Sequence, residues 1–344
     1  THPNQPPETY DYDAVGNRWP SVNVYDAANR LLEDAQFTYT YNRNGSLTSK
    51  TEKATSEVMK FYWTPENQLI KIEKYHTSET TPYTIATYIY DGFGRRVAKN
   101  VNGVITKYLY DKADILLETD NNDNVVARYT HGPGIDEPLI MQRGGQSYYF
   151  VTDGLGSVVK LVNSNGTVIN NYAYDSFGNI VSKTESVPNS YTYTAREFDP
   201  ESGLYYYRTR YYDARIGRFI SEDKNPGNIW EPISFNKFIY TYNNPVNWID
   251  PYGFEPECSG SNTGNNTDND TEQNDEYKPY LKPEAPKPDT EQKEKGWVDT
   301  AAKILGNKEV CWGNVCITVD VSINENEFHT EAETRAGTDI KIKW

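Results

Sequence analysis

Cysteine, methionine, long apolar runs and positive charge are all scarce in this sequence, and each scarcity excludes a class of protein. Only 3 of the 344 residues are Cys and 2 are Met, so disulfide bonds cannot form the framework of the fold. No run of about 18 apolar residues occurs, so no membrane-spanning segment is predicted. The 34 Lys and Arg face 49 Asp and Glu, which gives a formal net charge of −15. Because nucleic acids attract positive surfaces, we do not expect the repeat region to bind nucleic acid.

Tyrosine is the residue type that the sequence has in excess. The chain contains 29 Tyr against 11 Phe, while its hydrophobic content is only 36%. A composition rich in Tyr and punctuated by Asn and Gly favours strands and turns over helices. A Tyr can bury its ring while its hydroxyl reaches water or a polar partner, which suits sheets with one partly wet face.

A short unit recurs from the start of the chain. It consists of alternating aromatic or β-branched residues, then Asp or Asn, two further residues, Gly or Asn, and an apolar tail. The clearest copies read Tyr-Ile-Tyr-Asp-Gly-Phe-Gly-Arg-Arg-Val from Tyr88 and Tyr-Ala-Tyr-Asp-Ser-Phe-Gly-Asn-Ile-Val from Tyr172. Further copies begin at Tyr10, Tyr25, Tyr39 and Phe61, and a degenerate copy begins at Tyr108.

Each unit predicts a β-hairpin. The alternation has the period of a strand, and Asp-x-x-Gly predicts a turn in which Asp accepts backbone N–H bonds and Gly takes a positive φ. The apolar tail is the returning strand. A lone hairpin is marginally stable in water, so the hairpins must stack on their neighbours. The predicted fold class is all-β, and an ordinary β-sandwich with frequent turns is the weaker alternative.

These units resemble the YD (RHS) repeats of bacterial Rhs and wall-associated proteins, of toxin-complex C components and of teneurins. The stretch 148–254 resembles the RHS-repeat-associated core, because several core motifs occur in the family's order. They begin at Tyr149 (Tyr-Phe-Val-Thr-Asp-Gly), Gly203 (Gly-Leu-Tyr-Tyr-Tyr-Arg-Thr-Arg-Tyr-Tyr-Asp), Gly217 (Gly-Arg-Phe-Ile-Ser-Glu-Asp), Tyr242 (Tyr-Asn-Asn-Pro) and Asp250 (Asp-Pro-Tyr-Gly-Phe). The resemblance implies that repeats over residues 1–147 form a curved strip or partial shell, and that the core rolls inward as a plug.

The composition changes abruptly after Phe254. The stretch 255–295 is acidic and rich in Pro, Asn and Thr, so we predict a disordered linker. For 296–344 we predict a small variable module, either α+β or all-β. Trp297–Leu305 is compatible with a short helix, and the alternation Val310–Ile323 predicts a hairpin that turns at Gly313 and Asn314.

The chemistry of this last module is left open by its residues. Cys311 and Cys316 flank the predicted turn and could form a disulfide outside the cell. His329, Glu331 and Glu333 alternate, so one strand face could present all three to a divalent metal, but a solvated strand face is the preferred interpretation. We therefore predict no metal site and no cofactor.

Two acidic residues at the end of the core are the strongest candidates for chemistry. Asp223 follows Gly-Arg-Phe-Ile-Ser-Glu, and Asp250 opens Asp-Pro-Tyr-Gly-Phe. Two carboxylates held close together share one proton, so that the neutral one polarises a carbonyl and the charged one activates water. Arg210 is the preferred partner that keeps one carboxylate ionised, with Arg218 and Arg208 as alternatives. Asp-Pro-x-Gly also fits a type I turn, which is the structural alternative to catalysis.

The resemblance implies what these acids do. Core domains of several Rhs-type members resemble an intramolecular aspartyl protease that cuts just after the closing Asp-Pro-x-Gly-hydrophobe motif. Carried onto this chain, Asp223, Asp250 and Arg210 form the site, and the cut falls between Phe254 and Glu255. The change of composition at residue 255 fits a boundary between a folded shell and its cargo.

The family resemblance favours a secreted or cell-surface bacterial protein of the polymorphic-toxin type. Its β shell would scaffold or enclose the chain's own C-terminal segment as cargo, and the chain would cut itself between Phe254 and Glu255. One alternative is a non-catalytic surface scaffold that binds cell-surface glycans or another bacterial cell. A second alternative is that 296–344 is itself a small toxin enzyme.

Overall fold

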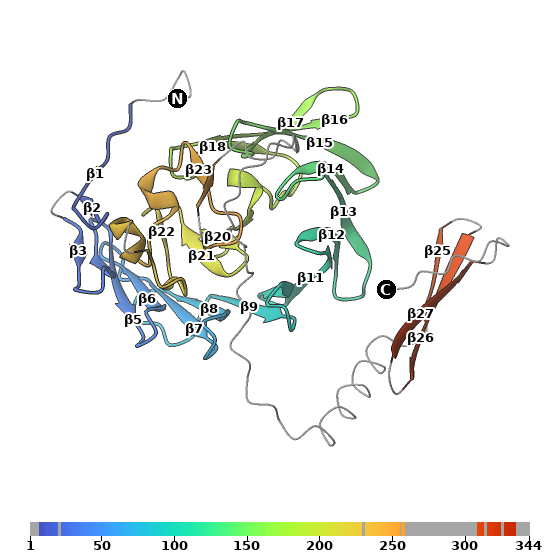
Figure 1. Ribbon diagram of the computed structural model, residues 1–344, viewed down its shortest axis with the longest axis horizontal. Coiled ribbons are helices and arrows are strands. Elements are labelled where there is room, and N and C mark those ends of the chain that lie inside the picture. The colour runs from blue at the N-terminus through green and yellow to red at the C-terminus, as the bar shows by residue number, and fades with distance from the viewer. Residues whose placement is uncertain are drawn as a thin grey trace, which may run out of the picture. The chain divides into compact units, whose positions relative to one another are not determined.

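The computed structural model describes residues 7–19, 22–228, 231–254 and 256–258, and the backbone of three strands between residues 308 and 334. The chain divides into two units, Thr1–Asn265 and Asn266–Trp344. The first unit contains a 16-stranded antiparallel sheet in which every strand pairs with its neighbours in sequence, from β3 to β18. In Figure 1 this strip curves around a smaller set of strands. The predicted all-β fold is confirmed.

The strands of the strip are short and follow one another without crossovers. Their bounds are β3 Val24–Tyr25, β4 Leu31–Glu33, β5 Phe37–Tyr41, β6 Leu47–Glu52, β7 Val58–Trp63, β8 Leu69–Tyr75, β9 Thr84–Tyr90, β10 Arg96–Val101, β11 Val104–Asp111, β12 Asp114–Thr119, β13 Val125–His131, β14 Pro138–Arg143, β15 Gln146–Thr152, β16 Val158–Asn163, β17 Val168–Tyr174 and β18 Ile180–Glu185.

The repeated Asp forms the turns that the sequence predicts. One carboxylate oxygen of Asp91, Oδ1, accepts the backbone N–H groups of Phe93 and Arg95, each at 2.9 Å. Gly94 occupies the left-handed region with φ +82, which a residue with a side chain adopts only under strain. The same pair of bonds to residues two and four positions on recurs at Asp13, Asp26, Asp120, Asp153 and Asp175.

The Tyr that precedes the turn explains the excess of Tyr over Phe. Tyr110 donates its hydroxyl to the carbonyl of Arg96 at 2.9 Å, and Tyr174 donates to the carbonyl of Val158 at 2.6 Å. In both cases the acceptor is the first residue of the strand that follows an earlier turn. Tyr41 and Tyr90 repeat this contact, and Trp63 makes it through Nε1. A Phe in these places would leave a carbonyl without its bond, which costs stability when the group is buried.

Inside the curve of the strip lies the core, built on β19 Glu197–Asp199, β20 Leu204–Tyr207, β21 Arg210–Asp213 and β22 Arg218–Phe219. These strands form one antiparallel sheet, and β23 Trp248–Ile249 pairs separately with β24 Glu257–Cys258. Short 3-10 helices span Tyr193–Ala195, Pro232–Phe235 and Thr241–Asn243. The described residues contain no helix long and apolar enough to cross a bilayer.

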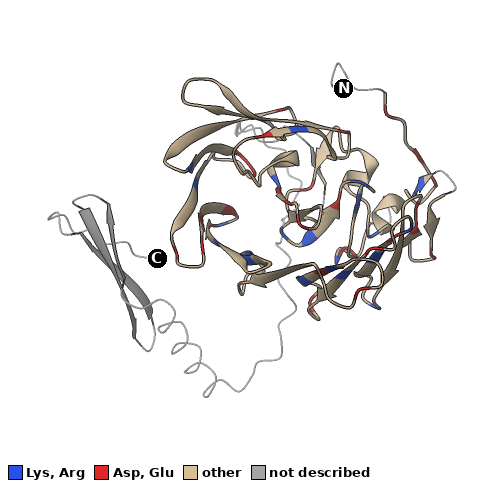
Figure 2. Ribbon diagram, turned by 180° about the vertical axis from the view of Figure 1, so that it is seen from behind, with Lys and Arg blue, Asp and Glu red and all other residues tan. Residues whose placement is uncertain are grey.

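Ion pairs attach the core to the strip. Lys50 of β6 lies 2.8 Å from Asp213, and Lys99 of β10 lies 2.8 Å from Asp199. Arg96 also pairs with Asp199, where both side chains are almost fully buried. A buried charge needs a partner, so each pair restricts where the core can sit. Figure 2 shows basic and acidic positions interspersed through the strip and the core rather than separated by sign.

A hairpin before the strip contacts the far end of the strip. It comprises β1 Asp11–Tyr12 and β2 Arg18–Trp19. The ring of Tyr10 meets Phe177 edge-on at 5.0 Å, and the Arg18 guanidinium stacks on Phe177 at 4.3 Å. Ser176 donates its backbone N–H to Glu8 at 2.9 Å. Since β3 and β18 are the end strands of the sheet, contacts that involve side chains, rather than strand pairing, link the hairpin before β3 to the turn before β18.

The second unit contains a three-stranded antiparallel sheet of β25 Lys308–Trp312, β26 Val315–Asn324 and β27 Glu327–Thr334. The predicted hairpin is therefore present, and Cys311 is registered opposite Cys316. His329, Glu331 and Glu333 all lie on β27 at alternating positions. The predicted helix at 297–305 and most of the predicted linker lie outside the described residues, and the bounds of the four predicted domains stay predictions.

Candidate functional site

Three residues that the sequence singles out meet at one point of the core. Arg210 begins β21, Asp223 follows β22, and Asp250 follows β23 directly. The same guanidinium nitrogen of Arg210, Nη2, lies 2.9 Å from Oδ2 of Asp223 and 3.5 Å from Oδ2 of Asp250. The two carboxylates therefore approach one cation from two different loops.

Asp250 is the more deeply buried of the two acids. Its side chain is 2% exposed, and that of Asp223 is 12% exposed. Oδ1 of Asp250 accepts the backbone N–H groups of Gly253 at 2.7 Å and Phe254 at 2.9 Å. Burial raises the pKa of Asp250 to about 6, although Arg210 and these two N–H groups favour its charged form. A carboxyl with such a pKa changes between its neutral and its charged form in mildly acidic solution.

Arg210 is fixed on every side. Its Nε donates to the carbonyl of Gly253 at 2.5 Å, and its Nη1 donates to the carbonyl of Lys237 at 3.1 Å. The guanidinium carbon of Arg210 lies over the ring of Phe219, 3.6 Å from the ring centre. Burial lowers the pKa of Arg210 against the attraction of Asp223 and Asp250. The bonds of Arg210 leave its Nη2 directed at the two acids.

The turn between β20 and β21 binds the segment that ends at Phe254. Arg208 donates to the carbonyl of Pro251. Thr209 donates its hydroxyl to the carbonyl of Tyr252 at 2.7 Å, and Arg210 donates to that of Gly253, as described above. Three consecutive side chains thus bind three consecutive carbonyls, and we call Arg208, Thr209 and Arg210 the carbonyl clamp.

The close fit of this segment explains its glycine. Gly253 has φ +76, and a Cβ at this position would lie 2.6 Å from the carbonyl oxygen of Tyr207 and 2.8 Å from the hydroxyl of Thr209. Both contacts are too short for carbon, and the φ value is unfavourable for any side chain. The Asp-Pro-Tyr-Gly-Phe segment therefore packs against the clamp only with Gly in its fourth position.

The structure brings Asp223, Asp250 and Arg210 together, and places Phe254 within one hydrogen bond of Asp250. Phe254 is 38% exposed, and Glu255 lies outside the described residues. The segment also bends at this point, where the backbone N–H of Gly253 donates to the carboxylate of Asp250. Asp250 therefore binds the backbone of this bend while it shares Arg210 with Asp223, and the catalytic role of these residues stays a prediction.

The alternative arginines have other partners. Arg218 donates to the side chains of Asn17 at 3.2 Å and Asn236 at 3.3 Å. Arg208 belongs to the clamp, as described above. Thr209 was missed by the sequence analysis, because one Thr in a turn carries no signal until the segment packed against it is known.

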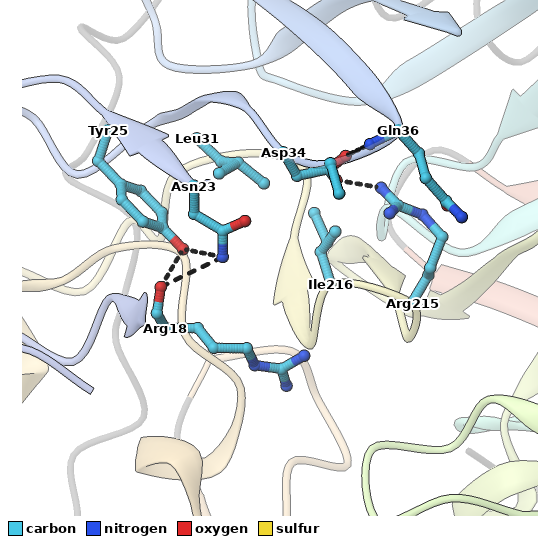
Figure 3. Close-up of a pocket in the computed structure, with 9 residues that line it drawn as sticks. Arg18, Asn23, Tyr25, Leu31, Asp34, Gln36, Arg215 and Ile216 are labelled. Atoms are coloured by element: carbon cyan, nitrogen blue, oxygen red, sulfur yellow. Dashed lines mark hydrogen bonds and ion pairs between the residues drawn. The ribbon is translucent and has the colours of Figure 1, made fainter. Parts of the chain in front are cut away.

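A separate pocket of about 230 Å³ lies between the first strands of the strip and the turn before β22. Figure 3 shows Arg18, Tyr25 and Leu31 on one side and Asp34 with Arg215 on the other. Nη2 of Arg215 lies 2.7 Å from Oδ2 of Asp34. None of the lining residues belongs to the group around Arg210, so the pocket is not the predicted site.

Where side chains are described, no group of three or more His, Cys, Asp or Glu residues is placed to hold a metal ion. The side chains of His329, Glu331 and Glu333 lie outside this description, so their metal-binding alternative is untested. The predicted lack of a cofactor stays a prediction.

Comparison with known families gives a match to the teneurin YD-shell over residues 2–246. The chain is 33% identical over 270 residues to the tRNA nuclease WapA of Bacillus subtilis, covering 74% of this chain and 11% of that protein. It is 24% identical over 287 residues to double-stranded DNA deaminase toxin A of Burkholderia cenocepacia, covering 72% of this chain and 19% of that protein. The crystal structure of TcdB2-TccC3 aligns with a TM-score of 0.48 and 20% identity over 72% of this chain and 16% of that one. The chain thus spans less than a fifth of the length of these relatives.

Proposed function

Since the chain belongs to the teneurin YD-shell family, we propose that it is the scaffold of a toxin-type protein that cuts itself between Phe254 and Glu255. The observation that supports this proposal is the position of Arg210 Nη2, 2.9 Å from Asp223 and 3.5 Å from Asp250. The backbone N–H of Phe254, which belongs to the residue before the cut, is already bonded to Asp250 at 2.9 Å. The residues proposed as acid, base and scissile segment therefore lie in one unit, which supports the proposal.

In the proposed reaction the two acids have different tasks. Arg210 favours the charged form of Asp223, which takes a proton from a water molecule. The water oxygen attacks the carbonyl carbon of Phe254, while protonated Asp250 donates its proton to the carbonyl oxygen. The tetrahedral intermediate collapses as the C–N bond breaks: Asp223 returns its proton to the nitrogen of Glu255, and one hydroxyl of the intermediate returns a proton to Asp250. The products are a carboxyl group on Phe254 and an amine on Glu255, with one water consumed.

The carbonyl clamp supports this reaction by holding the peptide near the acids before chemistry begins. An intramolecular substrate that is already oriented avoids much of the entropy loss of binding. The clamp binds backbone carbonyls, so the proposal does not depend on the side chains of Pro251 or Tyr252. Beyond the cut, we propose that the C-terminal segment is the cargo of a secreted or cell-surface protein.

Intact mass of the denatured protein tests this proposal. Denaturation is needed because β24 follows the proposed cut and pairs with β23, so the two pieces would stay together in native buffer. We expect two fragments that join at 254 and 255. Asp223→Asn and Asp250→Asn should each slow cleavage by about 10²–10⁴-fold, the contribution of an acid–base group.

Asp91→Asn is the matched control, because this acid forms a turn of the strip and is expected to leave cleavage unchanged. A single uncut mass for the unmodified chain would favour the non-catalytic surface scaffold. That scaffold would bind cell-surface glycans or another bacterial cell. Cleavage that survives both Asn variants would assign the cut to another protease.

A further inference from the structure

The loop between β13 and β14 carries a buried acid that the proposed reaction does not use. Asp136 has φ +57, a left-handed conformation that is uncommon for residues other than Gly, and its side chain is 9% exposed. It lies in the strip, far in sequence from the core. Among the described residues, Asp136 forms ion pairs with Arg196 and Arg208.

Asp136 binds these two arginines with short, charged hydrogen bonds. Nη1 of Arg196 donates to Oδ1 at 2.6 Å. Arg208 donates through both terminal nitrogens, Nη2 to Oδ1 at 2.7 Å and Nη1 to Oδ2 at 3.0 Å. The second contact is a bidentate pair, which fixes the plane of the guanidinium as well as its position.

The fixed guanidinium of Arg208 also contacts the scissile segment. The nitrogen that binds Oδ2 of Asp136, Nη1, also donates to the carbonyl of Pro251. The guanidinium carbon lies 5.4 Å from the ring centre of Tyr252. One nitrogen is therefore shared between an acid of the strip and the first carbonyl of the clamped segment.

The two arginines differ in what they would retain without Asp136. Arg196 also pairs with Glu197 at 2.6 Å and donates to the carbonyl of Tyr206 at 2.9 Å. Arg208 would keep the Pro251 carbonyl and the Tyr252 ring but lose its carboxylate. Removal of the charge on Asp136 should therefore act mainly on Arg208 and on the segment it holds.

We propose that Asp136 is a positioning residue for the self-cleavage: through Arg208 it sets the place of the Pro251 carbonyl, and thereby brings the Phe254–Glu255 bond to the two acids. This inference rests on the proposed function for its catalytic consequence, whereas the contact chain from Asp136 to Pro251 exists in the fold itself. Asp136 touches none of the reacting atoms. Through this contact, the position of the scissile segment in the core depends on correct folding of the β13–β14 loop of the strip.

The test compares cleavage in Asp136→Asn with a matched control. Each protein is unfolded, diluted into refolding buffer at pH 5.5, and sampled over time by intact mass. We expect Asp136→Asn to slow cleavage roughly 10- to 100-fold, as a small misplacement of reacting groups does. Arg208→Lys, which keeps one charge but not the bidentate pair, should fall between this variant and the unmodified chain. Asp34→Asn also removes an acid of the strip that pairs with an arginine of the core, and should cleave at the unmodified rate.

Hydrogen exchange gives a second result that does not need cleavage. In an Asp223→Asn background, the amides of Gly253 and Phe254 should exchange faster when Asp136→Asn is added, and not when Asp34→Asn is added. This readout separates the two proposals. If the unmodified chain stays uncut while exchange responds to Asp136→Asn, the proposed function fails and the positioning link stands.

Two results would overturn the inference. The first is that Asp136→Asn is cut at the same rate as the unmodified chain and that its Gly253 and Phe254 amides exchange no faster. The second is that Asp34→Asn slows cleavage as much as Asp136→Asn does, which would show that any lost ion pair between strip and core slows the cut. A variant that fails to fold is recognised by its urea melt, and Arg208→Lys then decides by the same criteria.

Discussion

The strip and the core use tyrosine in two different ways. In the strip each turn Tyr donates to one carbonyl of the chain before it, as Tyr110 and Tyr174 do. In the core the rings pack on one another: Tyr212 lies 4.4 Å from Tyr240, and the hydroxyls of Tyr207 and Tyr240 are 3.2 Å apart. The turns of the strip are therefore similar local units, whereas the core rings form one coupled cluster that also supports the site.

This difference predicts that truncations of similar size in the strip and in the core will have unequal effects on cleavage. A repeat turn depends mainly on its neighbours, so the loss of a turn contact that does not touch the core should stay local. Residues in contact within one cluster are energetically coupled, so a loss in the core should reach the site.

The largest expected effect comes from a pair of buried phenylalanines, one in each region. Phe219 of the core and Phe61 of the strip are 2% and 4% exposed. Truncation to Ala should cost about 3–5 kcal/mol of unfolding free energy in either place. Only Phe219→Ala should also abolish cleavage under folding conditions, because the Arg210 guanidinium rests on that ring at 3.6 Å. Urea melts and intact mass of both variants check this, and equal loss of cleavage in Phe61→Ala would break the comparison.

Two buried acids sharpen the comparison through pH. Burial raises the pKa of Asp250 to about 6, so the folded protein binds its proton more tightly than the unfolded chain does. The unfolding free energy should therefore fall as pH rises from about 4 to about 6, by on the order of 3 kcal/mol for this group. Asp250→Asn should remove this decline, as measured by urea melts at each pH.

Asp34 should behave in the opposite way. Burial would raise its pKa, but Tyr39 and Arg215 outweigh that and hold the pKa of Asp34 below its ordinary value. Its contribution to stability is present at neutral pH and is lost as pH falls below the ordinary value. If Asp34→Asn and Asp250→Asn changed the pH profile in the same direction, the assignment of the two environments would be wrong.

The smallest expected effect is the loss of one turn hydroxyl. Tyr110→Phe removes the bond to the carbonyl of Arg96 and should cost about 1 kcal/mol in a urea melt. Tyr149→Phe, at a position 40% exposed, should cost much less. Neither change should alter cleavage. A slower cut in Tyr110→Phe would show that the strip units are not independent of the core.

Much of the fold could be predicted because its signals are local. The bonds from Asp91 to Phe93 and Arg95 lie within five residues, so the sequence pattern alone predicts the turn. The grouping of Arg210, Asp223 and Asp250 could be predicted only from the order of the family's motifs.

Other parts of the site had no such signal. Asp136 and Arg208 are 72 positions apart, and Asp136 sits in a Gly-Pro-Gly-Ile-Asp loop without periodicity. Thr209 is visible as a contact only when the segment at Tyr252 is packed against it. Such contacts depend on how the strip curves around the core, which local propensity does not determine.

The proposed function requires that folding of the core assembles an aspartyl self-cleaving site whose acid is Asp250. The most direct measurement follows the fraction of cut chain after dilution from denaturant into buffers at pH 5 and pH 8. We predict a cut between Phe254 and Glu255 that is faster at pH 5, because Asp250 with a pKa of about 6 keeps its proton there. A chain that stays whole at both pH values after complete refolding would contradict the account.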